Sequence, residues 1–239
     1  EVENKLWICA ADCTGHGVPG AFMSMLGVTL LNEIAGKKEF TKANQVLNEL
    51  RGQVKTALKQ TGDDWKTPQD YKFCKPSQIN KNRLHESQNP ARAENISRKT
   101  QIGVKDGIDM AFCIFDKDQK KIQFSGAYNP IYLIRDSEFS EIKADKMPIG
   151  IYLREKEMFA NHEIELNKDD AFYIFSDGYI DQFGGNDGKK FKAKQFKALL
   201  KDIYAKPMQE QLQIISETMD EWKKGTEQVD DMLIIGARI

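Results

Sequence analysis

Ala10-Ala11-Asp12-Cys13-Thr14-Gly15-His16-Gly17-Val18-Pro19-Gly20 is the stretch of sequence that decides the fold. The apolar run 6–11 has the length of a buried strand, and apolar residues at helical spacing follow the stretch from Val18 to Ile34. The pattern predicts a strand, a glycine turn and a helix whose first turn holds Pro19, a position that tolerates proline. Asp12 would then lie at a strand end, where a carboxylate in a fixed position can bind a hard metal ion.

The apolar periodicity of the rest of the chain predicts further helices and strands on both sides of a central meander. Helices are expected over 18–36, 42–59, 192–203 and 208–222. Strands are expected over 110–115, 122–127, 131–134, 139–142, 163–166, 171–175 and 232–237. The alternation of single strands and helices that is typical of a parallel sheet is absent from this order. The sequence therefore predicts an α+β fold in which antiparallel sheets are covered by helix pairs.

The composition predicts one globular domain. A chain of 239 residues, 40% of them hydrophobic, can bury one large core. Residues 61–103 are dominated by polar and charged side chains, so this stretch is interpreted as a polar insertion. The net charge of −1, from 35 basic and 36 acidic residues, gives no electrostatic reason to expect nucleic acid as a partner.

The location of the domain is predicted from its cysteines and apolar runs. The four cysteines form no C-x-x-C pair, which favours a reducing compartment. No apolar run is interpreted as a membrane span and no signal peptide is recognised, so we expect a cytoplasmic domain that does not insert into a membrane. Because the chain begins at Glu1 and almost at once enters a strand, it is interpreted as a fragment of a longer protein.

Acidic residues lie at the ends of three apolar strands. Asp12 follows the first strand, Asp177 follows the run 172–176, and the pair Asp230-Asp231 precedes the last strand. Carboxylates at such positions cost free energy unless a cation or a hydrogen-bond donor compensates them. Oxygen ligands without histidine or thiolate partners favour magnesium or manganese over zinc. Such a site would support hydrolysis by a metal-activated water.

Each of these residues also has a simpler interpretation. A single aspartate at a strand end is commonly a turn or cap residue, and spacing alone does not bring Asp12 and Asp177 together. His16 is a candidate general acid or phosphate contact, but it can equally cap the following helix. Cys13 is a candidate nucleophile, although no second histidine in a recognisable setting supports that role.

The three segments together resemble the signature segments of a known family. Asp12 to Gly20, Phe175-Ser176-Asp177-Gly178 and Val229-Asp230-Asp231-Met232 are similar to those of metal-dependent (PPM) serine/threonine protein phosphatases, in the bacterial SpoIIE/RsbU-type branch. Supporting similarity lies in 105–109, 126–130, 148–150 and 181–185. The resemblance covers nearly the whole chain except about 61–103, so the chain is interpreted as a single phosphatase domain over 1–239.

The resemblance implies a fold, a reaction and a set of ligands. The fold would be a four-layer αββα sandwich of two antiparallel sheets flanked by helix pairs. Asp12 would bridge two Mn²⁺ or Mg²⁺ ions, the main-chain carbonyl of Cys13 would complete one site, and Asp177 and Asp230 would each bind an ion. Asp231 is a further candidate ligand. These residues would be catalytic through the water that the ions activate, without a phosphoenzyme.

The resemblance also implies one metal ligand that is missing from this sequence. Family members carry another metal-binding aspartate, on a strand that pairs with the one beginning near Lys5, and the sequence starts after that segment. The domain is therefore expected to be N-terminally truncated, and the fragment to be weakly active or inactive. A sheet that lacks its edge strand can pair with a second copy, so a homodimer is also expected.

Two functions of different classes follow. The first is a phosphoserine/phosphothreonine phosphatase, the output domain of a bacterial signalling protein with an upstream sensor domain. Its substrate would be a phosphorylated regulatory protein, a small partner-switching regulator of the anti-anti-sigma type. The alternative is a non-catalytic phosphoprotein-binding or regulatory module that retains the fold. The three retained aspartates favour catalysis, because buried unpaired carboxylates are costly.

Overall fold

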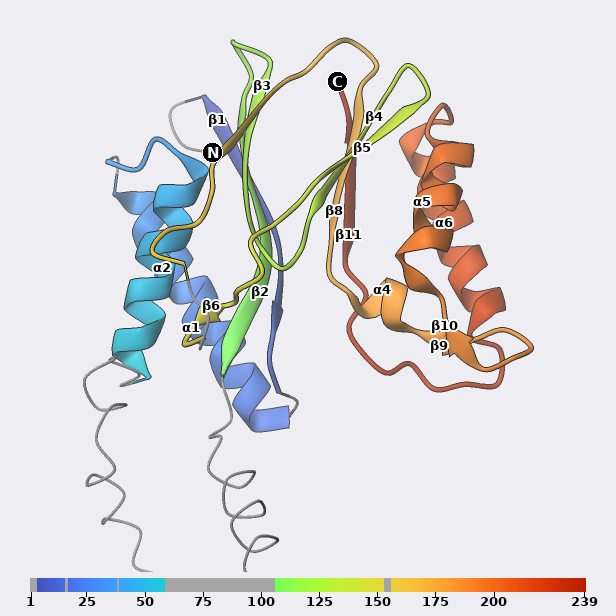
Figure 1. Cartoon of the computed structure of the whole chain (residues 1–239), viewed down its shortest axis with the longest axis horizontal. Coiled ribbons are helices and arrows are strands. Elements are labelled where there is room, and N and C mark those ends of the chain that lie inside the picture. Colours follow the sequence, from blue (N-terminus) through green and yellow to red (C-terminus); the bar gives the residue numbers. More distant parts are fainter. Residues whose placement is uncertain (1–3, 16, 38, 59–105, 153–155) are drawn as a thin grey trace, which may run out of the picture.

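The structure, a computed structural model, describes residues 4–15, 17–37, 39–58, 106–152 and 156–239. His16 and the segment 61–103, interpreted above as an insertion, lie outside the described residues. The described chain forms two antiparallel sheets packed face to face, with helices on both outer sides (Figure 1). This arrangement confirms the predicted α+β sandwich of four layers.

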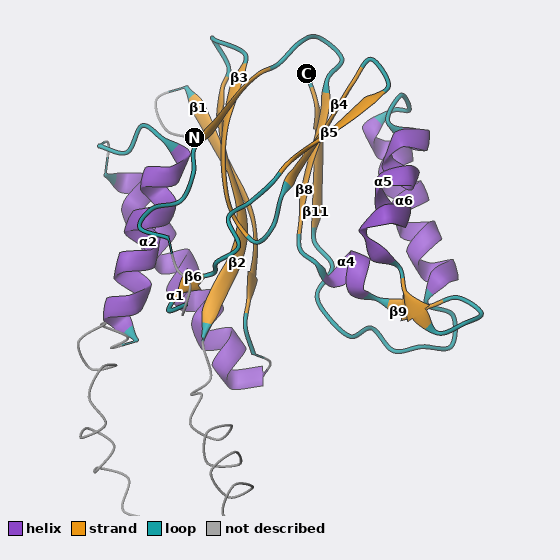
Figure 2. Cartoon of the chain, in the orientation of Figure 1, coloured by secondary structure: helices purple, strands orange, loops and turns teal. Residues whose placement is uncertain are grey.

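The first half of the sandwich consists of one sheet and two helices. Its strands are ordered β1-β2-β3-β7, with the short β6 paired to β2, and every pairing is antiparallel. The helices α1 and α2 cover the outer face of this sheet (Figure 2). The elements of the first half are β1 (Lys5–Cys13), α1 (Gly17–Gly36), α2 (Ala43–Ala57), β2 (Gly107–Asp116), β3 (Lys121–Ala127), β6 (Ile149–Gly150) and β7 (His162–Glu165).

The second half repeats this plan with different elements. Its sheet has the order β11-β8-β4-β5, again antiparallel throughout, and two helices pack on its outer face. The elements are β4 (Ile131–Arg135), β5 (Glu138–Ile142), β8 (Ala171–Phe175), α5 (Lys192–Ile203), α6 (Met208–Trp222) and β11 (Ile234–Arg238). All the strands and helices expected from the periodicity are present, with ends that differ by a few residues. Three hydrophobic clusters fill the spaces between the layers.

Four short elements were not predicted from the sequence. They are β6, α4 (Gly178–Asp181), β9 (Phe183–Gly184) and β10 (Lys189–Lys190). Each has only two to four residues, which is too short for a periodic pattern to reveal. The helix α4 matters for function because it begins directly after Asp177.

The buried face of α1 differs from the expected one. The apolar spacing suggested a face made of Val18, Phe22, Met25, Leu26 and Ile34. Ile34 is buried and Leu26 partly buried, yet Val18, Phe22 and Met25 are 84%, 58% and 71% exposed. The helix buries Gly20, Met23, Gly27 and Ile34. Glycines at the contact let the helix axis approach the sheet, since a Cβ on Gly27 would lie 2.9 Å from Ile108 Cδ1. The expected apolar face of α1 was therefore right for Leu26 and Ile34 and wrong for Val18, Phe22 and Met25.

The helix α1 also bears on the membrane prediction. Among the described residues it is the one helix long and apolar enough to cross a membrane by length and composition, and 22% of its apolar window is buried. No apolar run was interpreted as a membrane span from the sequence, whereas the helix α1 has the length and the mean composition of one. Here α1 packs beside α2 on the first sheet, through Met23 and Ile34. That the domain does not insert into a membrane stays a prediction.

Candidate metal centre

The first acidic ligand lies where β1 ends. Asp12 stands opposite Asp109 in the register of β1 and β2, so two carboxylates face each other across one strand pair. Thr14 fixes the end of β1, because its N–H donates to Gly107 O at 3.0 Å and its Oγ1 accepts the Gly107 N–H at 2.9 Å. The end of the strand, and with it Asp12, is thereby tied to the start of β2.

Glycines allow the turn after Asp12 to fold against the start of α1. Gly15 has a φ of +95°, in the left-handed region that favours glycine. A Cβ on Gly20 would lie 2.6 Å from Gly15 O, so a side chain there would push the turn away from the helix. The glycine-rich sequence therefore keeps the turn close to the strand end that carries Asp12.

The other two strand-end aspartates are brought together by Ser176 and Gly178. The Ser176 side chain donates to Asp231 O at 2.8 Å and accepts the Leu233 N–H at 3.1 Å, and Ser176 is 2% exposed. A Cβ on Gly178 would lie 2.3 Å from Asp231 O, so only glycine lets the 230–231 segment pack on the start of α4. This contact places Asp230 beside Asp177.

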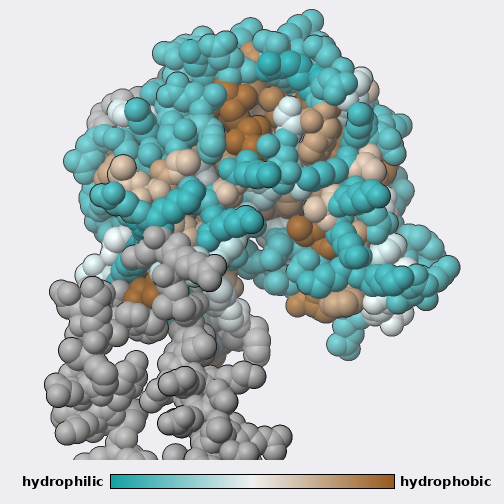
Figure 3. Space-filling model, viewed as in Figure 1, coloured by the Kyte–Doolittle hydropathy of each residue, from teal (hydrophilic) through white to brown (hydrophobic). Residues whose placement is uncertain are grey.

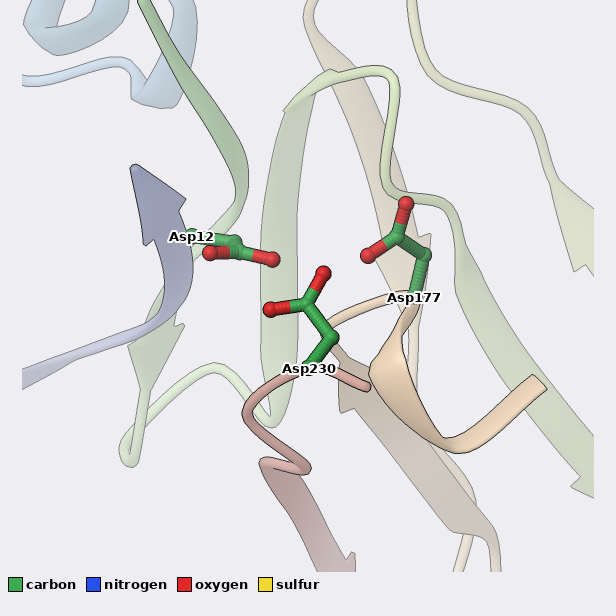
Figure 4. A group of neighbouring side chains, drawn as sticks. All are labelled: Asp12, Asp177 and Asp230. Atoms are coloured by element: carbon green, nitrogen blue, oxygen red, sulfur yellow. The ribbon is translucent and has the colours of Figure 1, made fainter. Parts of the chain in front are cut away.

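The carboxylates of Asp12, Asp177 and Asp230 converge between the two halves. Each offers an oxygen that lies within 4.8 Å of the corresponding oxygens of the other two. Figure 4 shows that they come from three separate segments and point into one space. Asp12 and Asp177 are half-buried, and Asp230 is exposed. Spacing along the chain did not predict this meeting, but the structure shows it.

The electrostatics of the cluster fit a divalent cation. Burial, followed by repulsion from Asp230 and Asp177, raises the pKa of Asp12 to about 6. Burial and repulsion from Asp181 and Asp230 also raise the pKa of Asp177. Oxygen donors that resist ionisation because they crowd one another are suited to a hard cation, which removes the repulsion. The residues present therefore fit Mg²⁺ or Mn²⁺.

Comparison with known families also indicates a metal-dependent enzyme. The family described as Stage II sporulation protein E (SpoIIE) matches residues 3–239, nearly the whole chain. The chain belongs to the SpoIIE family. This membership confirms the resemblance to the SpoIIE/RsbU-type branch of the PPM phosphatases, and with it the predicted enzyme class, a metal-dependent protein serine/threonine phosphatase. No match was found among the curated proteins.

Solved structures share the fold of this SpoIIE-family domain at low sequence identity. The SiaA-PP2C domain of Pseudomonas aeruginosa has a TM-score of 0.72 and 21% identity, over 99% of this chain and 80% of that one. The RsbU and RsbW domains of Rv1364c from Mycobacterium tuberculosis give 0.59 and 18%, over 99% and 52%. The catalytic domain of the phosphatase PstP, in complex with two manganese ions, gives 0.55 and 14%, over 97% and 86%. The chain thus spans about half the length of the Rv1364c structure.

The other residues that the sequence analysis proposed for the site lie near the three converging carboxylates or outside the described residues. Cys13 is half-buried at the end of β1, and burial raises the pKa of its thiol, which is opposite to what a nucleophile needs. The side chain of Asp231 is not among the three converging carboxylates, although its main-chain carbonyl accepts from Ser176. His16 lies outside the described residues.

Sequence reasoning did not assign a role to Asp109 or Ser176. Asp109 is half-buried, and burial, together with repulsion from Asp177 and Asp12, raises its pKa to about 7. The position of Asp109 inside the apolar strand 107–116 was a signal, because a carboxylate there needs a partner. Ser176 gave no such signal, since its contacts with 231–233 cross 55 residues or more of sequence.

Two clefts meet at the acidic cluster of the SpoIIE-family domain. One, of about 570 Å³, is lined by Asp12, Cys13 and Asp230. The other, of about 580 Å³, is lined by Asp109 and Asp177 together with residues of the 128–130 and 143–146 loops. Because the carboxylates at the two clefts lie within a few ångströms of each other, the centre is open to solvent from both sides.

Proposed function

We propose that the domain hydrolyses phosphoserine or phosphothreonine on a protein, and that Asp12, Asp177, Asp230 and the main-chain carbonyl of Cys13 hold two divalent ions. The observation that carries the proposal is the convergence of three carboxylates within 4.8 Å. The two manganese ions of the similar PstP domain support it. When bound, Mn²⁺ or Mg²⁺ would supply Lewis-acid activation of water and would offset the charge of the phosphoryl group.

The residues of the chain would position the ligands for the ions. Ser176 and Gly178 hold Asp230 next to Asp177, and Thr14 holds the strand end that carries Asp12. Because these ligands sit on strand ends and on tight turns, they are fixed before substrate arrives, which is the requirement for precise positioning. The Asp231 carboxylate is proposed as a further, outer ligand.

The proposed substrate is a phosphorylated regulatory protein of a bacterial signalling pathway, of the anti-anti-sigma type used in partner switching. The structural likeness to the RsbU and RsbW domains of Rv1364c supports this context. An upstream sensor domain in the same full-length protein would control this output domain in the cytoplasm. Among the described residues β1 pairs only with β2, so its other edge can pair with a second copy.

The test is manganese-dependent hydrolysis of p-nitrophenyl phosphate by the wild-type chain and by Asp177→Asn. Removal of one ligand carboxylate should lower the rate by more than about 100-fold, since changes one shell further out already cost 10- to 100-fold. Asp187→Asn is the matched control, because Asp187 is exposed and pairs only with the exposed Lys189 among the described residues.

A second measurement separates catalysis from binding. Manganese should raise the Tm of the wild type, and this shift should shrink in Asp177→Asn but not in Asp187→Asn. Because this fragment is expected to be weakly active or inactive, the full-length protein decides: if it shows the manganese shift yet hydrolyses no phosphate ester, the non-catalytic alternative is favoured. Full activity in Asp177→Asn would contradict the proposal.

A further inference from the structure

The second cleft at the metal centre has lysines in its lining, and the first has none. Its charged lining residues are Asp109, Glu141, Lys143, Lys146 and Asp177, and Tyr128 and Asn129 also line it. We call it the lysine cleft. In Figure 3 the surface is hollowed between the two halves of the molecule, with apolar atoms beside the hollow and hydrophilic residues around it.

The two lysines of the cleft are exposed to solvent. Within the described part of the chain neither forms an ion pair. Two neighbouring acidic residues are paired with other lysines: Glu141, which also lines the cleft, with Lys197 at 2.9 Å, and Asp145 with Lys156 at 2.6 Å. The lysine cleft therefore contains two lysines that form no ion pair with a described residue.

The loop that carries the lysines is held in one conformation. Asp145 is buried between them, and its N–H donates to Gly126 O at 3.0 Å while its carbonyl accepts the Tyr128 N–H at 2.9 Å. Its carboxylate also accepts the Ala160 N–H at 2.7 Å. A charge on a fixed loop loses less entropy when it binds than one on a mobile loop. The main chain at Asp145, between Lys143 and Lys146, is thus fixed before a ligand binds.

A further polar group beside the lysine cleft lacks a partner. Asn129 is 6% exposed, and within the described residues its Nδ2 has no hydrogen-bond acceptor. Buried amide nitrogens are nearly always paired, so an unpaired one next to a cleft indicates where a ligand oxygen can accept a hydrogen bond. The exposed ring of Tyr128, which has a φ of +60°, adds apolar surface at the same place.

We propose that the lysine cleft binds the segment of the substrate protein that flanks the phosphorylated residue, and that this segment is acidic. The inference rests on the proposed function, because the phosphoryl group would enter the metal centre next to Asp177. Carboxylates on the flanking segment would then reach Lys143 and Lys146. Charge complementarity of this kind selects among partners and speeds their encounter.

The experiment compares short phosphothreonine peptides that differ only in two flanking residues, both Glu or both Lys. Dissociation constants are measured by fluorescence anisotropy with non-hydrolysable phosphonate analogues, on the full chain with manganese. Because an exposed ion pair contributes up to about 1 kcal/mol, two pairs should give roughly tenfold tighter binding of the Glu peptide. This preference should vanish or invert in Lys143→Glu/Lys146→Glu and vanish in Lys143→Gln/Lys146→Gln.

The matched control is Lys168→Glu/Lys201→Glu, which changes the net charge equally at exposed lysines that do not line the cleft. It should keep the wild-type preference. Equal binding of both peptides by the wild type, or an equal loss of preference in the control, would overturn the proposal. The ratio of kcat/KM values for the hydrolysable peptides should follow the binding ratio. A wild type that binds with this preference but hydrolyses nothing would contradict the proposed function and leave the cleft assignment supported.

Discussion

The two halves of the sandwich differ in how much of the apolar surface of their helices is buried. In the second half, α5 and α6 close over a cluster of aromatic rings, in which Phe196 lies 5.1 Å from Phe175 and 4.9 Å from Tyr179. In the first half the core under α1 and α2 is mainly aliphatic, and α1 leaves four large apolar side chains exposed: Val18, Phe22, Met25 and Val28. On α5 and α6 the one large apolar side chain exposed in this way is Leu212, at 59%. The metal centre thus joins a half with largely covered helices, which carries Asp177 and Asp230, to a half with an open apolar helix, which carries Asp12.

The helices of the two halves contribute differently to the stability of the fold. Apolar area contributes to the free energy of folding only when it is removed from water, at roughly 25 cal/mol per Å². The helix α1 contains more apolar residues than α5 but buries fewer large side chains. Stability should therefore depend strongly on the rings of the second half and weakly on the outer face of α1.

The largest effect is expected for Phe196→Ala. Phe196 is fully buried among Tyr132, Phe175 and Tyr179, so its removal should leave a cavity and lower the free energy of unfolding by about 3–5 kcal/mol. Urea denaturation of both proteins measures the difference. Phe22→Ala is the matched control in the first half: at 58% exposure its effect should stay within about 0.5 kcal/mol. Equal losses at the two sites would remove the distinction between the halves.

An intermediate effect, on the affinity for manganese, is expected for substitutions of the residues that hold the metal ligands in place in each half. Ser176→Ala removes the bonds to Asp231 O and from the Leu233 N–H and should raise the manganese concentration for half-maximal activity by about 10-fold. Thr14→Val removes the corresponding bonds to Gly107 in the first half. Because Thr14 is exposed, water can replace them, and the shift should be smaller. A larger shift for Thr14→Val would place the control of metal affinity in the first half.

Most of the fold was predictable from the sequence because local patterns carry it. Alternating turn residues and apolar runs predict the strands between 110 and 142, and two helical stripes predict α5 and α6. The single meander expected from these strands was wrong, because β2 and β3 belong to one sheet and β4 and β5 to the other. The buried face of α1 was not predictable, because the helix is apolar on all sides and periodicity then gives no direction. Which side faces the sheet is decided by Gly20 and Gly27, whose missing side chains permit close approach.

In the candidate site, too, some features could be predicted from the sequence and others could not. Asp12, Asp177 and Asp230 could be proposed because each ends an apolar strand, a property visible in the sequence. The lysine cleft could not be proposed, because it forms only when the 143–146 loop packs beside Tyr128 through the main chain of Asp145. Contacts of this kind, between segments that no local pattern links, come from the packing of the two halves.

The smallest effect is expected for Met25→Lys on the outer face of α1, and it is the sharpest test of the comparison. Met25 is 71% exposed, so a lysine there should change the free energy of unfolding by no more than about 0.5 kcal/mol. Met23, two positions earlier on the same helix, is 3% exposed, and Met23→Lys would bury an unpaired charge at a cost of several kcal/mol. The two variants have the same chemistry and the same helix, so their difference reports only which face is covered. A loss above about 1 kcal/mol for Met25→Lys would mean that the outer face of α1 is covered in solution, and the first half would then be as closed as the second.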